Sequence, residues 1–226
     1  MKTTLLLDLD NTLLDFNKGE RMALKPVLDK YGIEDNEENR KLYSKINLSY
    51  WKKLERKEIT REEVVTLRWK EYFGYFHINS DGKEVNDIYF KCLKNSAYLL
   101  DGALDFLKDA SKYFNLYIIS NGIKEVQDNR LLLSGIKSYF KKIFISEELG
   151  YVKPEKEFFD LVLKESKLTK DECIVIGDSL SSDIQGAINS NIDYIYFDSF
   201  NINENYDDGP RCTTLRQVLD KALEMR

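Results

Sequence analysis

Histidine, cysteine and proline are scarce in this sequence of 226 residues. The single histidine, His77, would have to support any Ser-His-Asp triad or histidine-rich zinc site alone, so we expect it to have a surface or packing role. The three cysteines, Cys92, Cys173 and Cys212, are odd in number and widely spaced, which favours reduced thiols over a disulfide framework. Only three prolines and eleven glycines argue against long flexible linkers.

Long hydrophobic runs and an excess of one charge are also missing. The longest apolar runs have about five residues, whereas a membrane-spanning helix needs roughly twenty. The N-terminus, MKTTLLLDLD, reaches acidic residues too early for the apolar segment of a signal peptide. The net charge is −5, with acidic and basic residues interleaved, so no basic stripe favours nucleic acid. We therefore expect a cytoplasmic monomer or small homo-oligomer that binds neither nucleic acid nor a membrane.

Hydrophobic residues make up 42% of the chain and charged residues 32%, which suits a globular protein with a substantial core. Five short apolar runs are β-rich and nearly continuous rather than alternating. This pattern is typical of strands that are covered on both faces in a parallel sheet. Helical patterns separate most of these runs, and alternating strands and helices predict an α/β, Rossmann-like core with helices on both faces. The runs lie at 3–8, 116–120, 142–146, 173–178 and 194–198.

The helical patterns fall into two groups. In the first group, residues 101–114, 154–168, 182–190 and 214–225 alternate with the predicted strands, and Pro154 is placed at the first position of its helix. The second group follows the first strand without interruption, and Thr60 with Glu63 resembles a capping box. We therefore predict an α/β core of 1–16 and 99–226 with an inserted all-helical cap of 17–98. Its helices are expected at 18–32, 35–58, 60–76 and 82–95.

Polar side chains with a common chemistry follow several predicted strands. Asp8 and Asp10 come after the first strand, Ser120–Gly122 after the second and Asp178 after the fourth, while Lys153 follows the third. In parallel α/β sheets, ligands bind outside the carboxyl ends of the strands. Carboxylates, a hydroxyl, neighbouring amides and a lysine at one edge predict a site for a dianion and a divalent metal.

These residue types suit phosphoryl transfer. Asp8 is ionised at neutral pH and can attack phosphorus to form an aspartyl-phosphate. Asp10, two residues further on, can protonate the leaving alcohol and later take a proton from water. Asp178 can join Asp8 in holding Mg²⁺, and Ser120 and Lys153 can bind the phosphoryl oxygens. A cation also makes two neighbouring carboxylates at a strand end tolerable.

The motifs DLDNT, ISNG, the lysine before PEKEFF, and GDSLSSD resemble the four motifs of the haloacid dehalogenase superfamily. The resemblance covers essentially the whole chain and implies a helical cap of the C1 type. It also implies Asp8 as nucleophile, Asp10 as acid and base with a metal-binding carbonyl, and Asp178 as metal ligand. By the same resemblance the phosphate-binding residues are Ser120, Asn121 and Lys153, and the supporting residues are Thr12 and Asp183.

The segment 120–160 is similar to the branch of 5′-nucleotidases that act on pyrimidine and noncanonical nucleoside monophosphates. It implies that the partner is a small phosphorylated metabolite, a nucleotide. A sugar-phosphate or phosphoglycolate-type phosphatase or phosphomutase stays open, because the core motifs read only the phosphoryl group. A non-catalytic phosphate-binding protein is the alternative from another class, whereas Asp10 and Asp178 argue against a dehalogenase.

Aromatic residues of the predicted cap lie among basic ones. A nucleotide base could stack on one of these rings, although for any given ring a place in the core of the helical bundle is the favoured interpretation. Phe16 and Asn17 lie where the chain should leave the core, and could contact either the ligand or a hinge. The six rings are Tyr50, Trp51, Trp69, Tyr72, Phe73 and Phe76.

Overall fold

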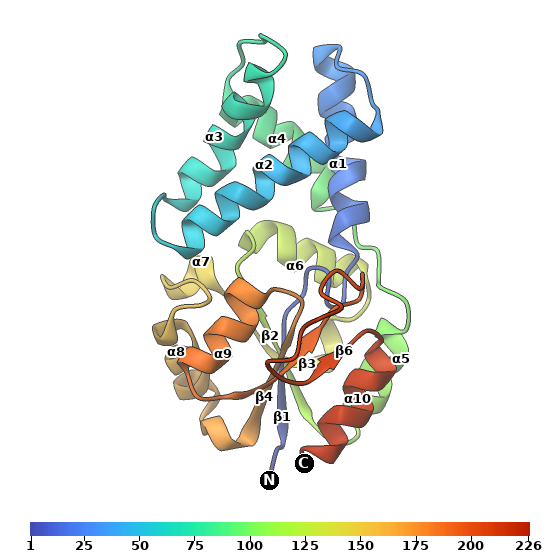
Figure 1. Cartoon of the computed structure of the whole chain (residues 1–226), viewed down its shortest axis with the longest axis vertical. Coiled ribbons are helices and arrows are strands. Elements are labelled where there is room, and N and C mark those ends of the chain that lie inside the picture. Colours follow the sequence, from blue (N-terminus) through green and yellow to red (C-terminus); the bar gives the residue numbers. More distant parts are fainter. The chain divides into compact units, whose positions relative to one another are not determined.

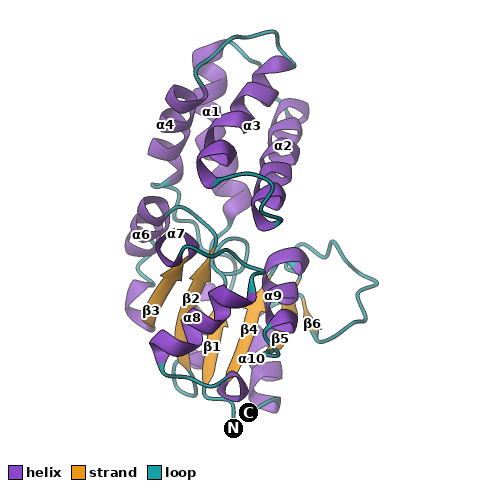
Figure 2. Ribbon diagram, turned by 90° about the vertical axis from the view of Figure 1, so that its left-hand side faces the viewer, coloured by secondary structure: helices purple, strands orange, loops and turns teal.

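The structure is a computed structural model that describes residues 1–226. The chain forms two compact units: an α/β unit of Met1–Phe16 with Ala97–Arg226, and a helical unit of Asn17–Ser96. The chain returns to the α/β unit between residues 96 and 97, two residues before the boundary expected from the sequence. Figures 1 and 2 show the sheet confined to the first unit and only helices in the second. None of the helices is both long enough and apolar enough to cross a membrane.

The α/β unit is built on a single parallel sheet, in the strand order β3-β2-β1-β4-β5-β6. The five strands predicted from the apolar runs are present, and a sixth strand of two residues adds to the edge. The first strand lies in the centre, where Leu7 is level with Ile118 on one side and Ile176 on the other. The strands are β1 (Thr4–Leu7), β2 (Asn115–Ser120), β3 (Phe140–Ile145), β4 (Cys173–Gly177), β5 (Asp193–Phe197) and β6 (Arg211–Cys212).

Helices cover both faces of this sheet, as the nearly continuous apolar runs predict. Leu5 and Leu7 point into one buried cluster and Leu6 into the other, because successive strand residues face opposite sides. The first cluster is completed by α5 (Ala103–Ala110), α6 (Lys124–Leu133) and α10 (Leu215–Glu224). The second is completed by α8 (Lys156–Ser166) and α9 (Gln185–Asn189). Figure 1 shows α8 and α9 on one side of the sheet and α5 and α10 on the other.

Two connections differ from the sequence-based expectation. The helix predicted to start at Pro154 begins at Lys156, because Glu155 has extended backbone angles at the position before the helix. Between β4 and α9 the chain forms a π-helical turn, Leu180–Ile184, where a regular helix was expected. The short helix α7 (Ser146–Leu149) follows β3 directly.

The helical unit contains four helices, and the starts of three of them follow from local capping. Asn36 caps α2, Thr60 and Glu63 form the predicted capping box of α3, and Asp81 caps α4. These side chains accept hydrogen bonds from backbone N–H groups that have no partner within the helix. The helices are α1 (Phe16–Tyr31), α2 (Glu37–Glu55), α3 (Arg61–Gly74) and α4 (Gly82–Leu93).

Aromatic side chains form much of the core of the helical unit. Trp69 stacks on Tyr43 with ring centroids 4.6 Å apart and meets Tyr89 edge-on at 5.3 Å. Of the six rings considered above, Trp51 and Phe76 keep partial exposure. The other four, Tyr50, Trp69, Tyr72 and Phe73, are buried, as the bundle-core interpretation predicts.

A buried polar network crosses the same core. Asn47 donates to Glu20 at 2.7 Å, and its carbonyl oxygen accepts from Arg68 at 2.7 Å and from Trp51 at 3.1 Å. Arg68 also donates to Asn86 at 2.7 Å. Burial raises the pKa of Glu20, although bonds from Ser44 and Asn47 and the charge of Arg68 oppose this rise. These hydrogen bonds link α1 to α2, α3 and α4, and each of them requires a particular orientation of donor and acceptor.

Candidate active site

The first motif leaves the sheet in a tight turn. The backbone N–H of Asp8 donates to the carbonyl of Ile176 at 2.9 Å, so the parallel ladder continues one residue past the end of β1. The chain then turns back, and the N–H of Asn11 donates to the carbonyl of Leu14 at 2.7 Å. Asn11 has a positive φ of 56°, which its short polar side chain tolerates. Asp8 is therefore buried at the strand end, while the Asp10 side chain keeps 28% exposure.

Lys153 reaches the same strand end from the loop before α8. Its ammonium group donates to Oδ1 of Asp8 at 2.7 Å, to Oδ1 of Asp183 at 2.6 Å and to the carbonyl of Ile119 at 2.9 Å. All three ammonium hydrogens thus have acceptors, as a fully buried lysine requires. Burial alone would lower its pKa, but Asp183 and Asp8 outweigh this effect and raise the pKa above its ordinary value.

Asn121 fixes the backbone that carries Lys153. The Asn121 side chain donates to the Lys153 carbonyl at 2.9 Å and accepts from the Lys153 N–H at 2.9 Å. This two-way bond ties the loop after β2 to the loop before α8. The Asn121 side chain is thus engaged with the backbone of Lys153, and the phosphate contact predicted for Asn121 stays a prediction.

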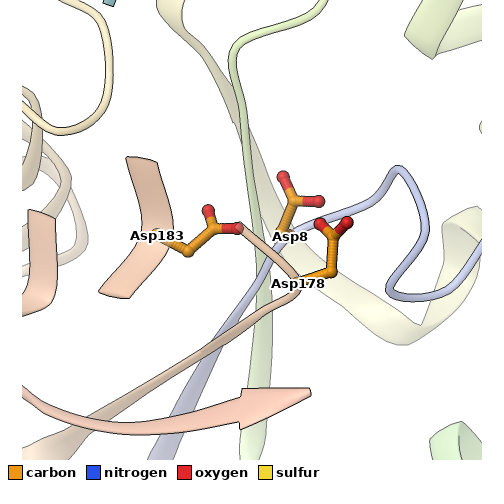
Figure 3. A group of neighbouring side chains, drawn as sticks. All are labelled: Asp8, Asp178 and Asp183. Atoms are coloured by element: carbon orange, nitrogen blue, oxygen red, sulfur yellow. The ribbon is translucent and has the colours of Figure 1, made fainter. Parts of the chain in front are cut away.

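Three carboxylates gather beside Lys153. Oxygen atoms of Asp8, Asp178 and Asp183 lie within 4.8 Å of one another, and Figure 3 shows the three side chains side by side. Asp183 comes close because β4 ends in Gly177, where a Cβ atom would lie only 2.2 Å from Oδ2 of Asp183. Asp183 has both oxygens occupied, since Oδ1 accepts from Lys153 and Oδ2 from the Ser179 N–H at 3.1 Å.

The charges of this cluster are not balanced by protein groups alone. Burial, with the nearby charges of Asp183 and Asp10, raises the pKa of Asp8 to about 7 although Lys153 lowers it. The pKa of Asp178 is raised well above its ordinary value by burial and by the charges of Asp8 and Asp183. Lys153 bonds to two of the three carboxylates. The ligand atoms are hard oxygen atoms, and three carboxylates face a single ammonium group. The cluster therefore fits a divalent cation such as Mg²⁺.

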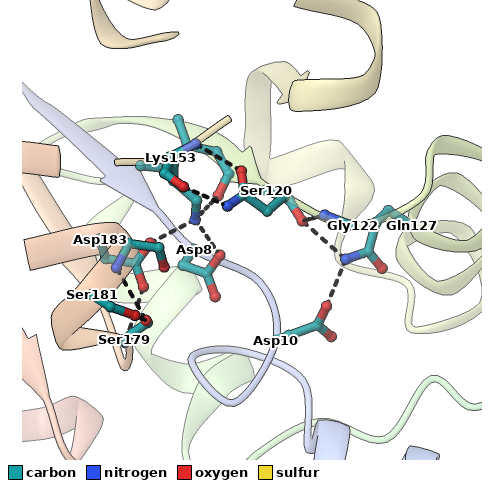
Figure 4. A network of polar contacts seen from close by, with 12 residues as sticks. Asp8, Asp10, Ser120, Gly122, Gln127, Lys153, Ser179, Ser181 and Asp183 are labelled. Atoms are coloured by element: carbon teal, nitrogen blue, oxygen red, sulfur yellow. Dashed lines mark hydrogen bonds and ion pairs between the residues drawn. The ribbon is translucent and has the colours of Figure 1, made fainter. Parts of the chain in front are cut away.

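Asp10 belongs to a second network, on the other side of the strand end in Figure 4. Its Oδ2 accepts from Gln127 at 2.7 Å, and its Oδ1 forms an ion pair with Arg130 at 2.5 Å. Gln127 also donates to the Ser120 hydroxyl at 3.0 Å. The structure therefore connects two residues predicted from the sequence, Asp10 and Ser120, through a third that was not predicted.

Gln127 and Arg130 were missed because α6 itself was not singled out from the sequence. The buried face of this helix carries both polar side chains, which interrupts the apolar periodicity that reveals helices. The available signal was their spacing of three, one helical turn, directly after ISNG. The remaining predicted residue, Thr12, is fully buried, and its hydroxyl has no hydrogen-bond partner.

Comparisons with known proteins agree with this architecture. The model of the family "haloacid dehalogenase-like hydrolase" matches residues 5–197. The chain is 37% identical over 195 residues to the pyrimidine 5′-nucleotidase PynA of Streptococcus pneumoniae, which covers 85% of this chain and 82% of PynA. It is 35% identical over 185 residues to the HAD-hydrolase YfnB of Bacillus subtilis, covering 81% of this chain and 79% of YfnB.

The likeness to YfnB extends to three dimensions. A crystal structure of YfnB bound to magnesium aligns with a TM-score of 0.91 and 31% identity, over 98% of this chain and 99% of YfnB. Fold and family match together define an enzyme of the hydrolase class. The chain belongs to the haloacid dehalogenase-like hydrolase family.

Proposed function

We propose that this hydrolase is a Mg²⁺-dependent phosphatase that cleaves a small phosphate monoester through an aspartyl-phosphate at Asp8. The observation that carries the proposal is the strand-end cluster of Asp8, Asp178 and Asp183 around the buried Lys153. A carboxylate at the end of a strand, next to a cation and a place for a metal, is the arrangement that an anionic nucleophile needs to meet an anionic substrate.

The first half of the reaction transfers the phosphoryl group to the protein. A carboxylate oxygen of Asp8 forms a bond to phosphorus while the ester P–O bond breaks, and Asp10 gives its proton to the leaving oxygen. The positive charge of Lys153, the Ser120 hydroxyl and the loop amides stabilise the charge on the phosphoryl oxygens. In the second half, water attacks phosphorus, Asp10 takes the water proton, and the Asp8–phosphorus bond breaks to release phosphate.

Asp8 must be a carboxylate to act as the nucleophile. With protein groups alone its pKa is about 7, so a large share of Asp8 would be protonated at neutral pH. Asp8, Asp178 and the Asp10 carbonyl would hold Mg²⁺, with Asp183 orienting its neighbours. When bound, Mg²⁺ supplies the positive charge that keeps carboxylates ionised and screens the substrate phosphate.

The substrate is a nucleoside 5′-monophosphate, with a pyrimidine base preferred. The likeness to PynA supports this choice, because PynA is a pyrimidine 5′-nucleotidase. Trp51 supports it as well, since its ring is partly exposed and its indole N–H is already fixed by Asn47 at 3.1 Å. A partly exposed, oriented indole suits stacking against a base.

A screen of phosphate esters with purified protein tests the proposal. We expect Mg²⁺-dependent hydrolysis of 4-nitrophenyl phosphate and a higher kcat/KM for at least one pyrimidine monophosphate than for hexose phosphates or phosphoglycolate. Hexose phosphates or phosphoglycolate exceeding every nucleotide would contradict the nucleotide assignment and leave a sugar-phosphate or phosphoglycolate phosphatase. Absence of turnover on every ester with Mg²⁺ present would contradict the phosphatase itself.

A further inference from the structure

The Asp10 carboxylate is held from two directions by α6. Arg130 bonds to Oδ1 at 2.5 Å and Gln127 to Oδ2 at 2.7 Å, so both oxygens have a defined donor. Arg130 has no solvent exposure and Gln127 has 1%. A buried arginine beside a carboxylate is costly to desolvate, and replacing such an ion pair as a whole by apolar side chains of similar volume often leaves the fold as stable or makes it more stable. Such a pair therefore points to a role beyond packing.

Arg130 also determines which way the Gln127 amide faces. The same Nη1 atom that bonds to Asp10 donates to Oε1 of Gln127 at 2.9 Å. With the amide oxygen turned toward Arg130, the amide nitrogen must face the other way, where it donates to Asp10 and to Ser120. The guanidinium thus orients Asp10 directly and Ser120 through Gln127.

The orientation of the Gln127 amide determines where the hydrogen of the Ser120 hydroxyl can point. Its oxygen accepts from Gln127 at 3.0 Å and from the Gly122 N–H at 3.1 Å. Two accepted bonds use both lone pairs, so the hydroxyl hydrogen must point elsewhere and is free to be donated. Gly122 leaves room for this arrangement, because a Cβ atom there would lie 2.4 Å from Nε2 of Gln127.

We propose that Gln127 and Arg130 are positioning residues that hold the Asp10 carboxylate for proton transfer and aim the Ser120 hydroxyl at a phosphoryl oxygen. The proposal rests on the proposed phosphatase function. Both residues act through their bonds to Asp10 and, in the case of Gln127, through its bond to Ser120. A displacement of about 1 Å in a reacting group costs about 100-fold in rate, so loss of this support should be visible in turnover.

The test compares esters that differ in how much they need acid assistance. Arg130→Met is assayed on 4-nitrophenyl phosphate, whose leaving group needs no proton, and on an alkyl or nucleoside phosphate that the wild type hydrolyses. We expect kcat/KM to fall about 10- to 100-fold on the second ester and clearly less on 4-nitrophenyl phosphate. Arg130→Lys, which keeps a donor and a charge, should recover part of the loss. The control Arg216→Met removes an exposed arginine of the same unit and should leave both rates unchanged.

A double-mutant cycle with Asp10→Asn separates positioning from a structural role. If Arg130 acts through Asp10, adding Arg130→Met to Asp10→Asn should cost far less than it costs the wild type. An equal loss on both esters, or a full loss in the Asp10→Asn background, would overturn the proposal. Should Arg130→Met fail to fold, judged by circular dichroism, the near-isosteric Gln127→Glu serves instead. This variant also loses the bond to Ser120, so both rates should fall, with the larger fall on the second ester, and unchanged rates on both esters would overturn the proposal. Wild-type protein inactive on all esters would count against the phosphatase and not against the positioning alone.

Discussion

Asp8 and Asp10 are two residues apart, and each is paired with a different basic side chain. Lys153 bonds to Asp8 at 2.7 Å and Arg130 to Asp10 at 2.5 Å. Both cations are buried and come from different segments, one from the loop before α8 and one from α6. Two carboxylates this close would otherwise repel each other and favour protonation. The two cations offset part of this repulsion, although the pKa of Asp8 remains raised.

A substitution of Asp178 tests the metal site by a measurement that does not depend on turnover. A ligand that binds only the folded state adds about 2.7 kcal/mol of stability at one hundred times its Kd. We expect Mg²⁺ to raise the melting temperature of the wild type and to raise that of Asp178→Asn much less, because a ligand has been removed. Asp220→Asn, an exposed carboxylate of the same unit, is the control and should respond like the wild type. The same Mg²⁺ shift in Asp178→Asn and the wild type would exclude Asp178 as a ligand.

Among the helices and strands, the sequence predicts those that bury apolar side chains. The runs around Leu5–Leu7 and Cys173–Gly177 are found as strands because both faces pack on helices. α6 is not found, since Gln127 and Arg130 are buried by polar contacts made in three dimensions. β6 has only two residues, too few for any pattern.

In the candidate site as well, residues set by local sequence could be predicted, whereas contacts between distant parts of the chain could not. Asp8, Ser120 and Asp178 could be placed because each directly follows a strand, and parallel strands bring their carboxyl ends to one edge. The partners of Asp10 could not be predicted from the sequence, because Arg130 is 120 residues away along the chain. The start of α8 was placed two residues early, because a proline suits a first helical turn and nothing local shows that Glu155 is extended.

The network in the helical unit makes a prediction about pH and stability. Since burial raises the pKa of Glu20 above its ordinary 4.5, the folded state binds more protons than the unfolded state from about that pH upward. The free energy of unfolding of the wild type should therefore fall relative to Glu20→Gln as pH rises from 4.5 toward the raised pKa, by at most about 1.4 kcal/mol per pH unit.

Urea denaturation of both proteins at several pH values between about 5 and 8 measures this difference. Glu84→Gln, an exposed glutamate of the same unit, controls for the general effect of removing a carboxyl group. A difference between wild type and Glu20→Gln that stays constant across this range would show that the pKa of Glu20 is not raised.

For the whole molecule, the two units are expected to divide the recognition of a phosphate ester. The residues proposed to contact the phosphoryl group all belong to the α/β unit, so we expect discrimination between leaving groups to depend mainly on the helical unit. If Trp51 stacks on a base, Trp51→Ala should lower kcat/KM for a pyrimidine monophosphate by a factor that corresponds to about 1–3 kcal/mol. The rate on 4-nitrophenyl phosphate should hardly change. Phe76→Ala, the other partly exposed ring, is the matched control. Equal losses on both esters would exclude a stacking role for Trp51.

We expect Asp8 to carry the phosphoryl group during turnover. The measurement is acid quenching of the protein during hydrolysis of 4-nitrophenyl phosphate with Mg²⁺, followed by borohydride reduction and peptide mass spectrometry. Asp10→Asn serves as a second sample, because loss of the base should let the intermediate accumulate. We expect reduction of the acyl-phosphate to homoserine at position 8 only, and neither label nor turnover in Asp8→Asn. A label on any other residue, or full turnover by Asp8→Asn, would contradict the role of Asp8 as nucleophile.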